Sequence, residues 1–277
     1  MSIMSVRTNV ASMMAAGQLS RTNNGLASSL GKISSGVRIN SAAEDAAGLG
    51  VATNLENQVI STRQAMRNTN DGISIIQTAE SAANEVTDIL QRMRELAVQS
   101  SSETLADSER SFITDEFTQL RSEVQRIAEV TEFNGIALAN GTTTTLAVQV
   151  GIQNNTTSRI AINLGNLTTG TSALNITALD LGSVSGAQSA INTLDTALTS
   201  VNSFRSAFGA VQNRLDSALN NSQIYTEALS SAQSQIMDTD FATETSNLTK
   251  LQIMQQAGVA SLAQAKNINQ SVISLLS

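Results

Sequence analysis

The chain has 277 residues, a net charge of -7, and no Cys, His, Trp or Pro. Without thiolates or imidazoles it lacks the ligands of a structural zinc or haem site and the parts of a Ser/His or Cys/His nucleophilic centre. The negative charge and the lack of a cluster of Lys and Arg argue against binding to nucleic acid or an anionic membrane, and Lys occurs only at positions 32, 250 and 266. Aromatic residues make up 3 % of the chain, which favours thin helical bundles over a thick sandwich.

The N-terminal stretch, residues 1–37, has the apolar periodicity of a helix, with one break in register between Met14 and Leu19. Its stripe consists of Val6, Val10, Met14, Leu19, Leu26, Leu30, Ile33 and Val37. Residues 34–40 interrupt the pattern with Ser, Gly and Asn. Ser41 and Glu44 then have the spacing of a capping box, so a second helix is expected to begin at Ser41.

Two long helical segments are predicted before residue 131. The stripe of the first persists for about fifty residues, or roughly 75 Å, a length that requires packing along its whole side. Residues 100–104 interrupt this stripe, and residues 104–130 form a shorter helix with Phe112, Phe117 and Val124 among its apolar positions. The two helices are expected to lie antiparallel as a helical hairpin.

The middle of the chain differs in composition, because Arg159 and Asp180 are the only charged residues between positions 133 and 190. Apolar and polar residues alternate over 146–152 and again over 160–164, which predicts a β-hairpin with one apolar face. Residues rich in Gly, Ser and Thr follow and are typical of a loop. Ser185 and Gln188 resemble a second capping box and predict the start of another long helix.

Residues 240–276 carry a narrow apolar seam with steps of three and four residues. The seam consists of Leu248, Leu251, Met254, Gly258, Leu262, Ala265, Ile268, Val272 and Leu275. A seam this narrow needs a partner helix, and the N-terminal stripe is the candidate. Because apolar stripes at both ends exceed what one chain can cover, with Ile3, Val259 and Ile273 lying off the main seams, self-assembly is predicted.

Together these elements predict a mainly α fold: an elongated, hairpin-shaped chain of long helices that forms a terminal coiled coil and an adjoining helical bundle, with one small β-hairpin. Residues 1–40 and 235–277 are expected to form an inner coiled-coil core domain. Residues 41–140 and 186–234 would form the helical bundle domain. The hairpin and a short loop would occupy residues 141–185, at the far end of the folded-back chain.

Six segments resemble sequence blocks of the bacterial flagellins. They are ISSGVRINSAAEDAAGL at 33–49, NDGISIIQTAE at 70–80, QRMRELAVQ at 91–99, FNG at 133–135, GAVQNRL at 209–215 and QIMQQAG at 252–258. They stand in the family's order and cover residues 1–140 and 186–277, so the chain is identified as similar to this family over most of its length.

The resemblance implies a structural subunit that self-assembles into the helical filament of the bacterial flagellum for swimming motility. The family's variable outer domain is almost absent here, which implies a thin, smooth filament. Implied partners are other copies in an open helical homopolymer, a flagellar export chaperone, the filament cap, hook-associated proteins and the animal Toll-like receptor for flagellin. The implied location is extracellular, in the flagellar filament, after type III export without a cleaved signal, in agreement with the absence of a signal-like or membrane-spanning apolar segment.

The resemblance also assigns roles to individual residues. The surface implied for the neighbouring subunit and the innate immune receptor comprises Arg92, Leu96 and Glu116, although a charged helix face is by itself typical of a solvated surface. The loop that joins the coiled coil to the next shell contains Gly36, Arg38 and Asn40, where Gly36 is expected to adopt a backbone shape that a Cβ would hinder. Packing of the inner helix is assigned to Gln255, Gln256 and Gly258.

Three other functions fit parts of the sequence. Carboxylate pairs at Glu44/Asp45 and Asp238/Asp240 could serve as acid and base, but Asp238 and Asp240 precede a helix start and are expected to act as caps. The chain is therefore not predicted to be an enzyme, and no cofactor or metal is expected. A hook–filament junction protein of the same superfamily and a cytoplasmic coiled-coil signalling module remain as alternatives.

The family's Ile-Pro-Gln motif near the C-terminus is replaced here by Ile-Asn-Gln at residues 268–270. Because Pro interrupts helices, the kink or helix stop that the family motif implies is expected to be missing.

Overall fold

The computed structural model describes residues 8–274, and side chains as far as residue 267. It is mainly α, as predicted, with helices α1 (Val10–Ser35), α2 (Ala46–Ser100), α3 (Asp107–Val130), α4 (Val184–Met237) and α5 (Phe241–Ser274). Short strands β1 (Glu132–Phe133) and β2 (Ile136–Ala137) precede the hairpin of β3 (Thr145–Gln149) and β4 (Arg159–Asn163), whose turn contains the 3₁₀ helix η1 (Thr156–Ser158). The chain forms two compact units, one from residues up to 57 and from 228 onward, the other from residues 58–227.

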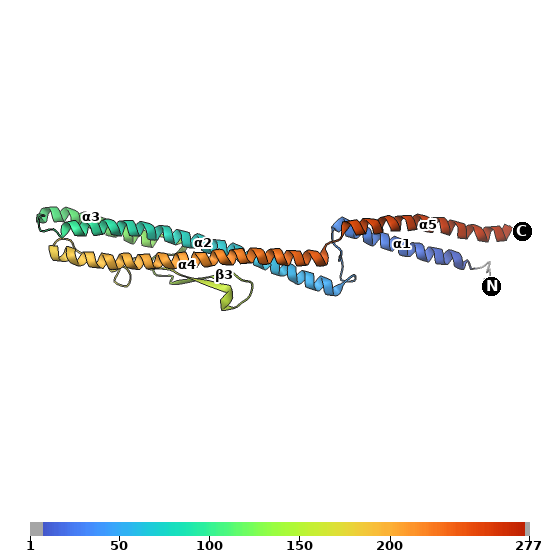
Figure 1. Cartoon of the computed structure of the whole chain (residues 1–277), viewed down its shortest axis with the longest axis horizontal. Coiled ribbons are helices and arrows are strands. Elements are labelled where there is room, and N and C mark those ends of the chain that lie inside the picture. The colour runs from blue at the N-terminus through green and yellow to red at the C-terminus, as the bar shows by residue number, and fades with distance from the viewer. Residues whose placement is uncertain (1–7, 275–277) are drawn as a thin grey trace. The chain divides into compact units, whose positions relative to one another are not determined.

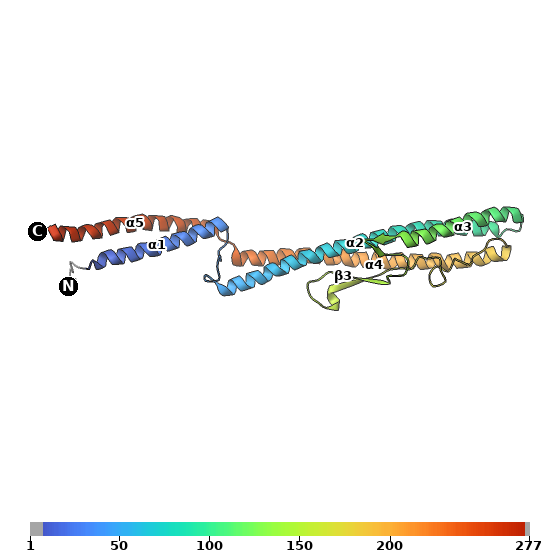
Figure 2. The same ribbon diagram turned by 180° about the vertical axis from the view of Figure 1, so that it is seen from behind.

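The first unit is an antiparallel pair of helices, α1 and α5, which lie side by side in Figures 1 and 2. The antiparallel direction follows from two hydrogen bonds: Asn9 Nδ2 donates to Ala265 O at 2.9 Å, and Gln255 Nε2 donates to Asn23 Oδ1 at 2.8 Å. The predicted pairing of the two ends is therefore present. The helix α5 also continues past residues 268–270 to Ser274 without a stop, as the missing Pro predicts.

A short connector ends α1 and meets the end of α4 within the first unit. Gly36 has φ 73° and ψ 1° and donates its N–H to Lys32 O at 2.9 Å, so it closes the helix in the left-handed conformation that glycine adopts without strain. The chain then pairs with residues 237–239, because Arg38 N donates to Met237 O at 2.6 Å and Thr239 N donates to Gly36 O at 3.0 Å.

The start of α2 differs from the prediction. The helix begins at Ala46, and Asp45 caps it by accepting a hydrogen bond from Gly48 N at 2.8 Å. Ser41 instead forms a backbone turn with Glu44, and the Glu44 carboxylate accepts from Asn40 N at 2.8 Å. The capping-box spacing was therefore misleading, because Glu44 serves the connector and leaves Asp45 to cap the helix.

This correction predicts unequal effects for two alanine substitutions. Asp45→Ala is expected to lower the free energy of unfolding by about 1 kcal/mol, the usual cost of losing a helix cap. Ser41→Ala is expected to stay within about 0.5 kcal/mol of the parent, as exposed side chains without a special role do. Urea denaturation of the monomer, followed by circular dichroism, compares the two. Equal losses of stability, or a larger loss for Ser41→Ala, would mean that Ser41 caps the helix after all.

The second unit packs α3 and α4 against α2. The α2–α3 pair is antiparallel, because Arg92 contacts Glu116 while Ser100 O accepts from Arg110 Nε. The α2–α4 pair is antiparallel too, because Arg94 contacts Asp195 while Gln58 accepts from the Tyr225 hydroxyl. Its main core lies between the three helices and contains the fully buried side chains of Leu90, Met93, Phe117, Leu194 and Val201, among others. The predicted helical hairpin of α2 and α3 is therefore present, and α4 completes the bundle.

The β3–β4 hairpin lies against α2 and α4 rather than at the end of the bundle. Its register pairs Thr145 with Asn163 and Gln149 with Arg159. The predicted apolar face is correct, because Val148, Ile160 and Ile162 are buried in a second core cluster with Ile76 of α2 and Leu215 of α4. The end of the bundle is formed instead by the α2–α3 turn, where Ser100 Oγ donates to Leu181 O at 2.7 Å. The hairpin therefore does not occupy the far end as expected, whereas the loop before α4 reaches it through Leu181.

The remaining helix starts are also set by single caps. Ser183 Oγ accepts from Gly186 N at 3.1 Å at the start of α4, two residues before the predicted cap at Ser185. Asp240 caps α5 by accepting from Ala242 N at 3.0 Å and from the Thr243 hydroxyl at 2.7 Å, as predicted. The hydrogen bond from the Thr243 side chain, followed by the backbone hydrogen bonds, holds the pKa of Asp240 below its ordinary value.

Candidate functional site

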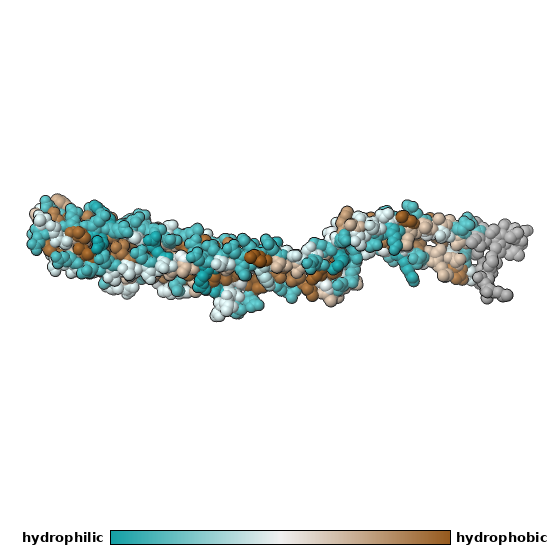
Figure 3. Space-filling model, viewed as in Figure 1, coloured by the Kyte–Doolittle hydropathy of each residue, from teal (hydrophilic) through white to brown (hydrophobic). Residues whose placement is uncertain are grey.

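The α1–α5 pair has almost no hydrophobic core of its own. Along α1 and the described side chains of α5, the buried residues are Thr22 and Ser29. Large apolar side chains are instead exposed, in α1 as Val10, Met13, Met14 and Leu30 and in α5 as Phe241, Ile253, Met254 and Val259. Figure 3 shows apolar atoms at the surface over this pair of helices. Isolated apolar residues are common on protein surfaces, but two helices that expose this many have a face that needs cover.

The contact between α1 and α5 is made by a thin seam. A Cβ built at Gly258 would lie 3.3 Å from Leu19 Cδ1, so glycine allows the close approach that was predicted. Gln255 joins the seam through its hydrogen bond to Asn23. Gln256 is exposed and is not part of the seam. Met254 was predicted to belong to the seam, but it is 37 % exposed. Ile268 and Val272 lie outside the described side chains, and Leu275 outside the described residues.

The predicted connector residues come together at the end of α4. The Arg38 guanidinium donates from Nη2 to Ile236 O at 2.6 Å and to Gln235 O at 3.4 Å, so a cation satisfies carbonyls at the helix C-terminus. Asn40 Nδ2 donates to Ser35 Oγ at 3.2 Å. Together with Gly36, these residues fix the connector by polar contacts on either side of the buried Ile39.

Glu44 is a connector residue whose role the sequence reasoning missed. Its carboxylate accepts from Asn40 N and lies 3.6 Å from Lys32 Nζ. The hydrogen bond from Asn40 and the nearby Lys32 charge hold the pKa of Glu44 below its ordinary value. Glu44 closes the turn that begins at Ser41. The sequence reasoning assigned it to a capping box instead.

The structure places only two of the three predicted interface residues of the bundle at the surface. Arg92 Nη2 lies 2.8 Å from Glu116 Oε1, and its Nη1 lies 3.0 Å from Glu95 Oε2, with all three side chains largely exposed. The hydrogen bond to Glu116 is the largest cause that raises the pKa of Arg92. Leu96 does not join them, because it is 1 % exposed and packs inside the three-helix core.

A neighbouring ion pair was not singled out from the sequence. Arg94 Nε donates to Asp195 Oδ1 at 2.6 Å and its Nη2 donates to Oδ2 at 3.3 Å, which links α2 to α4 in a bidentate arrangement. The two residues are 101 positions apart in sequence, so local charge spacing could not have paired them. The hydrogen bond from Arg94 lowers the pKa of Asp195.

The Arg94–Asp195 pair predicts an acid-sensitive contribution to stability. Because the pKa of Asp195 is lower in the folded chain, this contribution is present above the unfolded aspartate pKa and is lost as the pH falls through the folded one. The parent should therefore be more stable than Arg94→Gln at pH 7, and the gap should close on acidification. Urea titrations of both chains at several pH values test this. A gap that stays constant as Asp195 is protonated would show that the ion pair contributes nothing.

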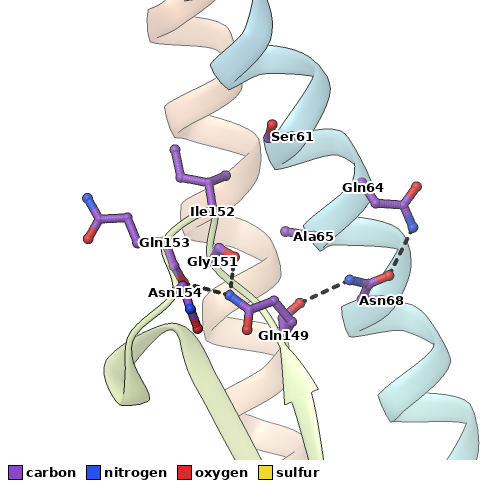
Figure 4. Close-up of a pocket in the computed structure, with 9 residues that line it drawn as sticks. All are labelled: Ser61, Gln64, Ala65, Asn68, Gln149, Gly151, Ile152, Gln153 and Asn154. Atoms are coloured by element: carbon purple, nitrogen blue, oxygen red, sulfur yellow. Dashed lines mark hydrogen bonds between the residues drawn. The ribbon is translucent and has the colours of Figure 1, made fainter.

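A polar hollow of about 310 Å³ lies between α2 and the hairpin turn (Figure 4). Asn68 bridges it, because its Nδ2 donates to Gln149 O at 3.3 Å while its Oδ1 accepts from Gln64 Nε2 at 2.9 Å. Gln149 Nε2 in turn donates to the carbonyls of Gly151 and Gln153. None of the nine lining residues has an ionisable side chain, so the one hydroxyl among them, that of Ser61, has no general base beside it in this lining.

Metal sites and membrane spans are both absent from the described part of the chain. No group of three or more acidic, His or Cys side chains there is placed to hold a metal ion. Within the same residues, no helix has the length and apolar character needed to cross a membrane. The candidate functional surfaces of the described residues are therefore the exposed apolar faces of α1 and α5 and the charged surface of the bundle.

Comparisons with known proteins agree with these features. Residues 6–144 match the family described as the bacterial flagellin N-terminal helical region, and residues 191–276 match the bacterial flagellin C-terminal helical region. A flagellin of Halalkalibacterium halodurans is 41 % identical over 245 residues, which cover 88 % of this chain and 89 % of that protein. The flagellar filament 33 kDa core protein of Treponema phagedenis is 37 % identical over 287 aligned positions, covering 99 % of this chain and all of that protein.

A solved structure from Vibrio parahaemolyticus, described as a flagellar hook-associated protein, shares the fold. Its TM-score is 0.60, and the match covers 70 % of this chain and all of that one. At 16 % sequence identity the likeness concerns the fold alone, and it does not raise the hook–filament junction alternative above a filament subunit. The two family matches and the near full-length relatives show that this chain belongs to the bacterial flagellins and is a structural subunit of the flagellar filament.

Proposed function

We propose that the exposed apolar faces of α1 and α5 are the surfaces through which the chain self-assembles into the helical filament used for swimming motility. One observation carries this proposal: the pair buries Thr22 and Ser29 while leaving Met13, Ile253 and Val259 more than half exposed. Apolar area that stays in water in one copy stabilises the contact when other copies cover it. Contacts between different faces of successive copies, when they do not close a ring, give an open helical polymer.

Seeded growth tests the proposal. Purified full-length chain is mixed with short fragments of filament, and growth is followed by light scattering and electron microscopy. Elongated filaments with a critical concentration support the proposal. Soluble, unpolymerised chain at high concentration, with seeds present, contradicts it.

The same proposal divides the chain by its place in the filament. Residues 1–40 and 235–277 are the inner coiled-coil part, residues 41–140 and 186–234 the surrounding bundle, and residues 141–185 replace a variable outer domain. The hairpin supports this division, because β3 and β4 pack into the bundle core and leave little chain to project outward. A thin, smooth filament follows.

Arg92 and Glu116 are proposed to form part of the contact with a neighbouring subunit, and also the surface read by the animal Toll-like receptor for flagellin. Support comes from their exposure and from the ion pair that holds both groups in one geometry. Leu96 supports this surface from beneath, because its buried side chain positions the α2 turn that carries Arg92.

A charge reversal separates this role from a merely structural one. Arg92→Glu is expected to slow seeded growth at least tenfold, because it replaces the cation that both Glu95 and Glu116 contact with a third carboxylate. The double variant Arg92→Glu with Glu116→Arg restores the pair within the chain and reverses the charges presented outward. If the residues contact a neighbour, the double variant stays slow. Full recovery of growth would show that the pair acts only inside the subunit.

The remaining partners follow from the same assignment. The chain is proposed to be secreted through the flagellar type III export channel with an export chaperone, and to meet the filament cap and hook-associated proteins outside the cell. It is proposed to act without enzymatic activity, cofactor or nucleic acid. The location of the filament itself is extracellular, as its family implies.

A further inference from the structure

The sulfur atoms of this chain are distributed unevenly between its two units. All eight are methionine thioethers, because the chain has no Cys, and His and Trp, which are also readily oxidised, are absent. In the first unit Met13 is 66 % exposed, Met14 71 % and Met254 37 %. In the second unit Met93 is completely buried and Met66 is of intermediate exposure, as is Met237 of the first unit. The most accessible thioethers described therefore lie on the two helices that expose apolar faces.

Exposed thioethers react with peroxides in a single two-electron step. The sulfur attacks one oxygen of the hydroperoxide, the O–O bond breaks, and a sulfoxide and water form when the oxidant is hydrogen peroxide. The sulfur is oxidised and the peroxide reduced, and no other reactant is needed. The product is polar and chiral, and methionine sulfoxide reductases can reverse the change.

Oxidation of these thioethers would place polar sulfoxides on the exposed apolar surfaces of α1 and α5. Met13 and Met14 follow one another on α1, in the turn after Val10, so their side chains occupy adjacent sectors of an apolar surface. Met254 follows exposed Ile253 on α5 and lines a shallow hollow with Thr249 and Lys250. A sulfoxide oxygen on either surface must give up water when a neighbouring copy covers it, a cost that the exposed apolar side chains beside Met13 and Met14 do not offset with a donor.

We propose that Met13, Met14 and Met254 are oxidation sites that decide whether a subunit can enter the filament. This inference rests on the proposed role of α1 and α5 in assembly. In a free subunit the three thioethers are open to peroxide, and their sulfoxides prevent the helices from being covered. In the filament the same thioethers are covered by neighbouring copies, so an assembled subunit resists the oxidant that disables a free one.

The test compares free and assembled wild-type protein. Free subunits are treated with hydrogen peroxide, freed of peroxide, and added to seeds, and sulfoxide at each methionine is measured by peptide mass spectrometry. The critical concentration is expected to rise at least tenfold and to return to its original value after treatment with methionine sulfoxide reductases. Intact filaments are treated in parallel, and sulfoxide should form at least tenfold more slowly at positions 13, 14 and 254 than in free subunits.

A leucine variant identifies the sulfur atoms responsible. The triple variant Met13→Leu, Met14→Leu and Met254→Leu keeps apolar side chains of similar volume, so it should assemble and should keep assembling after peroxide treatment. Met93→Leu is the matched control, because it removes a buried thioether and should leave the parent's sensitivity unchanged. If the triple variant remains as sensitive as the parent, the proposal is wrong.

A second measurement needs no variant. Wild-type subunits are oxidised partially and offered to seeds, and the incorporated and soluble fractions are separated. Sulfoxide at positions 13, 14 and 254 should be depleted at least tenfold in the incorporated fraction, whereas sulfoxide at position 66 should be shared equally. Equal distribution at all four positions overturns the proposal. Failure of untreated subunits to grow on seeds would instead overturn the proposed assembly role, so the two failures are distinguishable.

Discussion

The variant Ile253→Glu with Val259→Glu is expected to lose filament growth while its bundle stays folded. Ile253 is 61 % exposed and Val259 54 % exposed in the single chain. Covering the exposed part of each side chain contributes about 1–2 kcal/mol to the free energy of adding a subunit to the filament, since full burial of an aliphatic side chain contributes about 1.5–3 kcal/mol. Each new carboxylate would also have to be desolvated. The combined loss exceeds about 3 kcal/mol, so the critical concentration should rise more than about 100-fold.

The conservative variant Ile253→Leu with Val259→Ile is the matched control and should assemble normally, because it keeps apolar side chains at both positions. Critical concentrations of the three chains are measured by sedimentation of seeded samples. Circular dichroism of the free subunits shows whether each chain is folded. Normal growth of the glutamate variant would mean that this face of α5 stays in water in the filament.

A second large effect is expected from two phenylalanines on α3. Phe117 is 1 % exposed and lies in the core between the three helices, whereas Phe112 is 74 % exposed on the same helix. Phe117→Ala is expected to lower the free energy of unfolding of the second unit by about 3–5 kcal/mol, the cost of an aromatic cavity in a packed core. Phe112→Ala should change it by less than about 0.5 kcal/mol.

Denaturant titration of the free subunits, followed by the helical signal, measures both values. Seeded growth of the Phe112→Ala chain adds a second readout, because a side chain this exposed can weaken a contact between copies without destabilising the monomer. Similar unfolding free energies for the two variants would show that α3 does not pack on α2 as described.

The sequence predicted the positions of the helices better than the residues at which they begin. Apolar periodicity located all five helices because each long stripe is repeated over many turns. Helix starts were less certain, because Ser41 with Glu44 and Ser185 with Gln188 satisfy a spacing rule that the folded connectors override. Asp45 and Ser183 cap the helices instead, since the side chain that reaches the first free N–H depends on where the preceding turn leaves the backbone.

The candidate site was predictable to a similar degree. Gly36 was identified by a backbone shape that favours glycine, and its φ of 73° agrees with that. At Gly258 a Cβ would only press on Leu19 Cδ1, at 3.3 Å. Leu96 could not be placed from its family match alone, because Arg92 and Leu96 lie one turn apart on the same side of α2. The long Arg92 side chain reaches solvent there, while Leu96 packs into the core. The stripe of α1 also failed at Val10, Met14 and Leu30, which are exposed because α5 covers only a narrow sector of the helix.

The pairing of α1 with α5 also constrains the order in which the chain can fold. The hydrogen bond between Asn9 and Ala265 spans 256 positions, so forming it first would require closing a very long loop. Contacts between α2 and α3 are far more local and form at a lower entropic cost. Once the bundle has brought residues 38 and 237 together, only two short connectors separate α1 from α5. Residues as far as 265 must therefore have been synthesised before this hydrogen bond can form, and a chain shortened before residue 241 should fold its bundle yet never gain the α1–α5 pair.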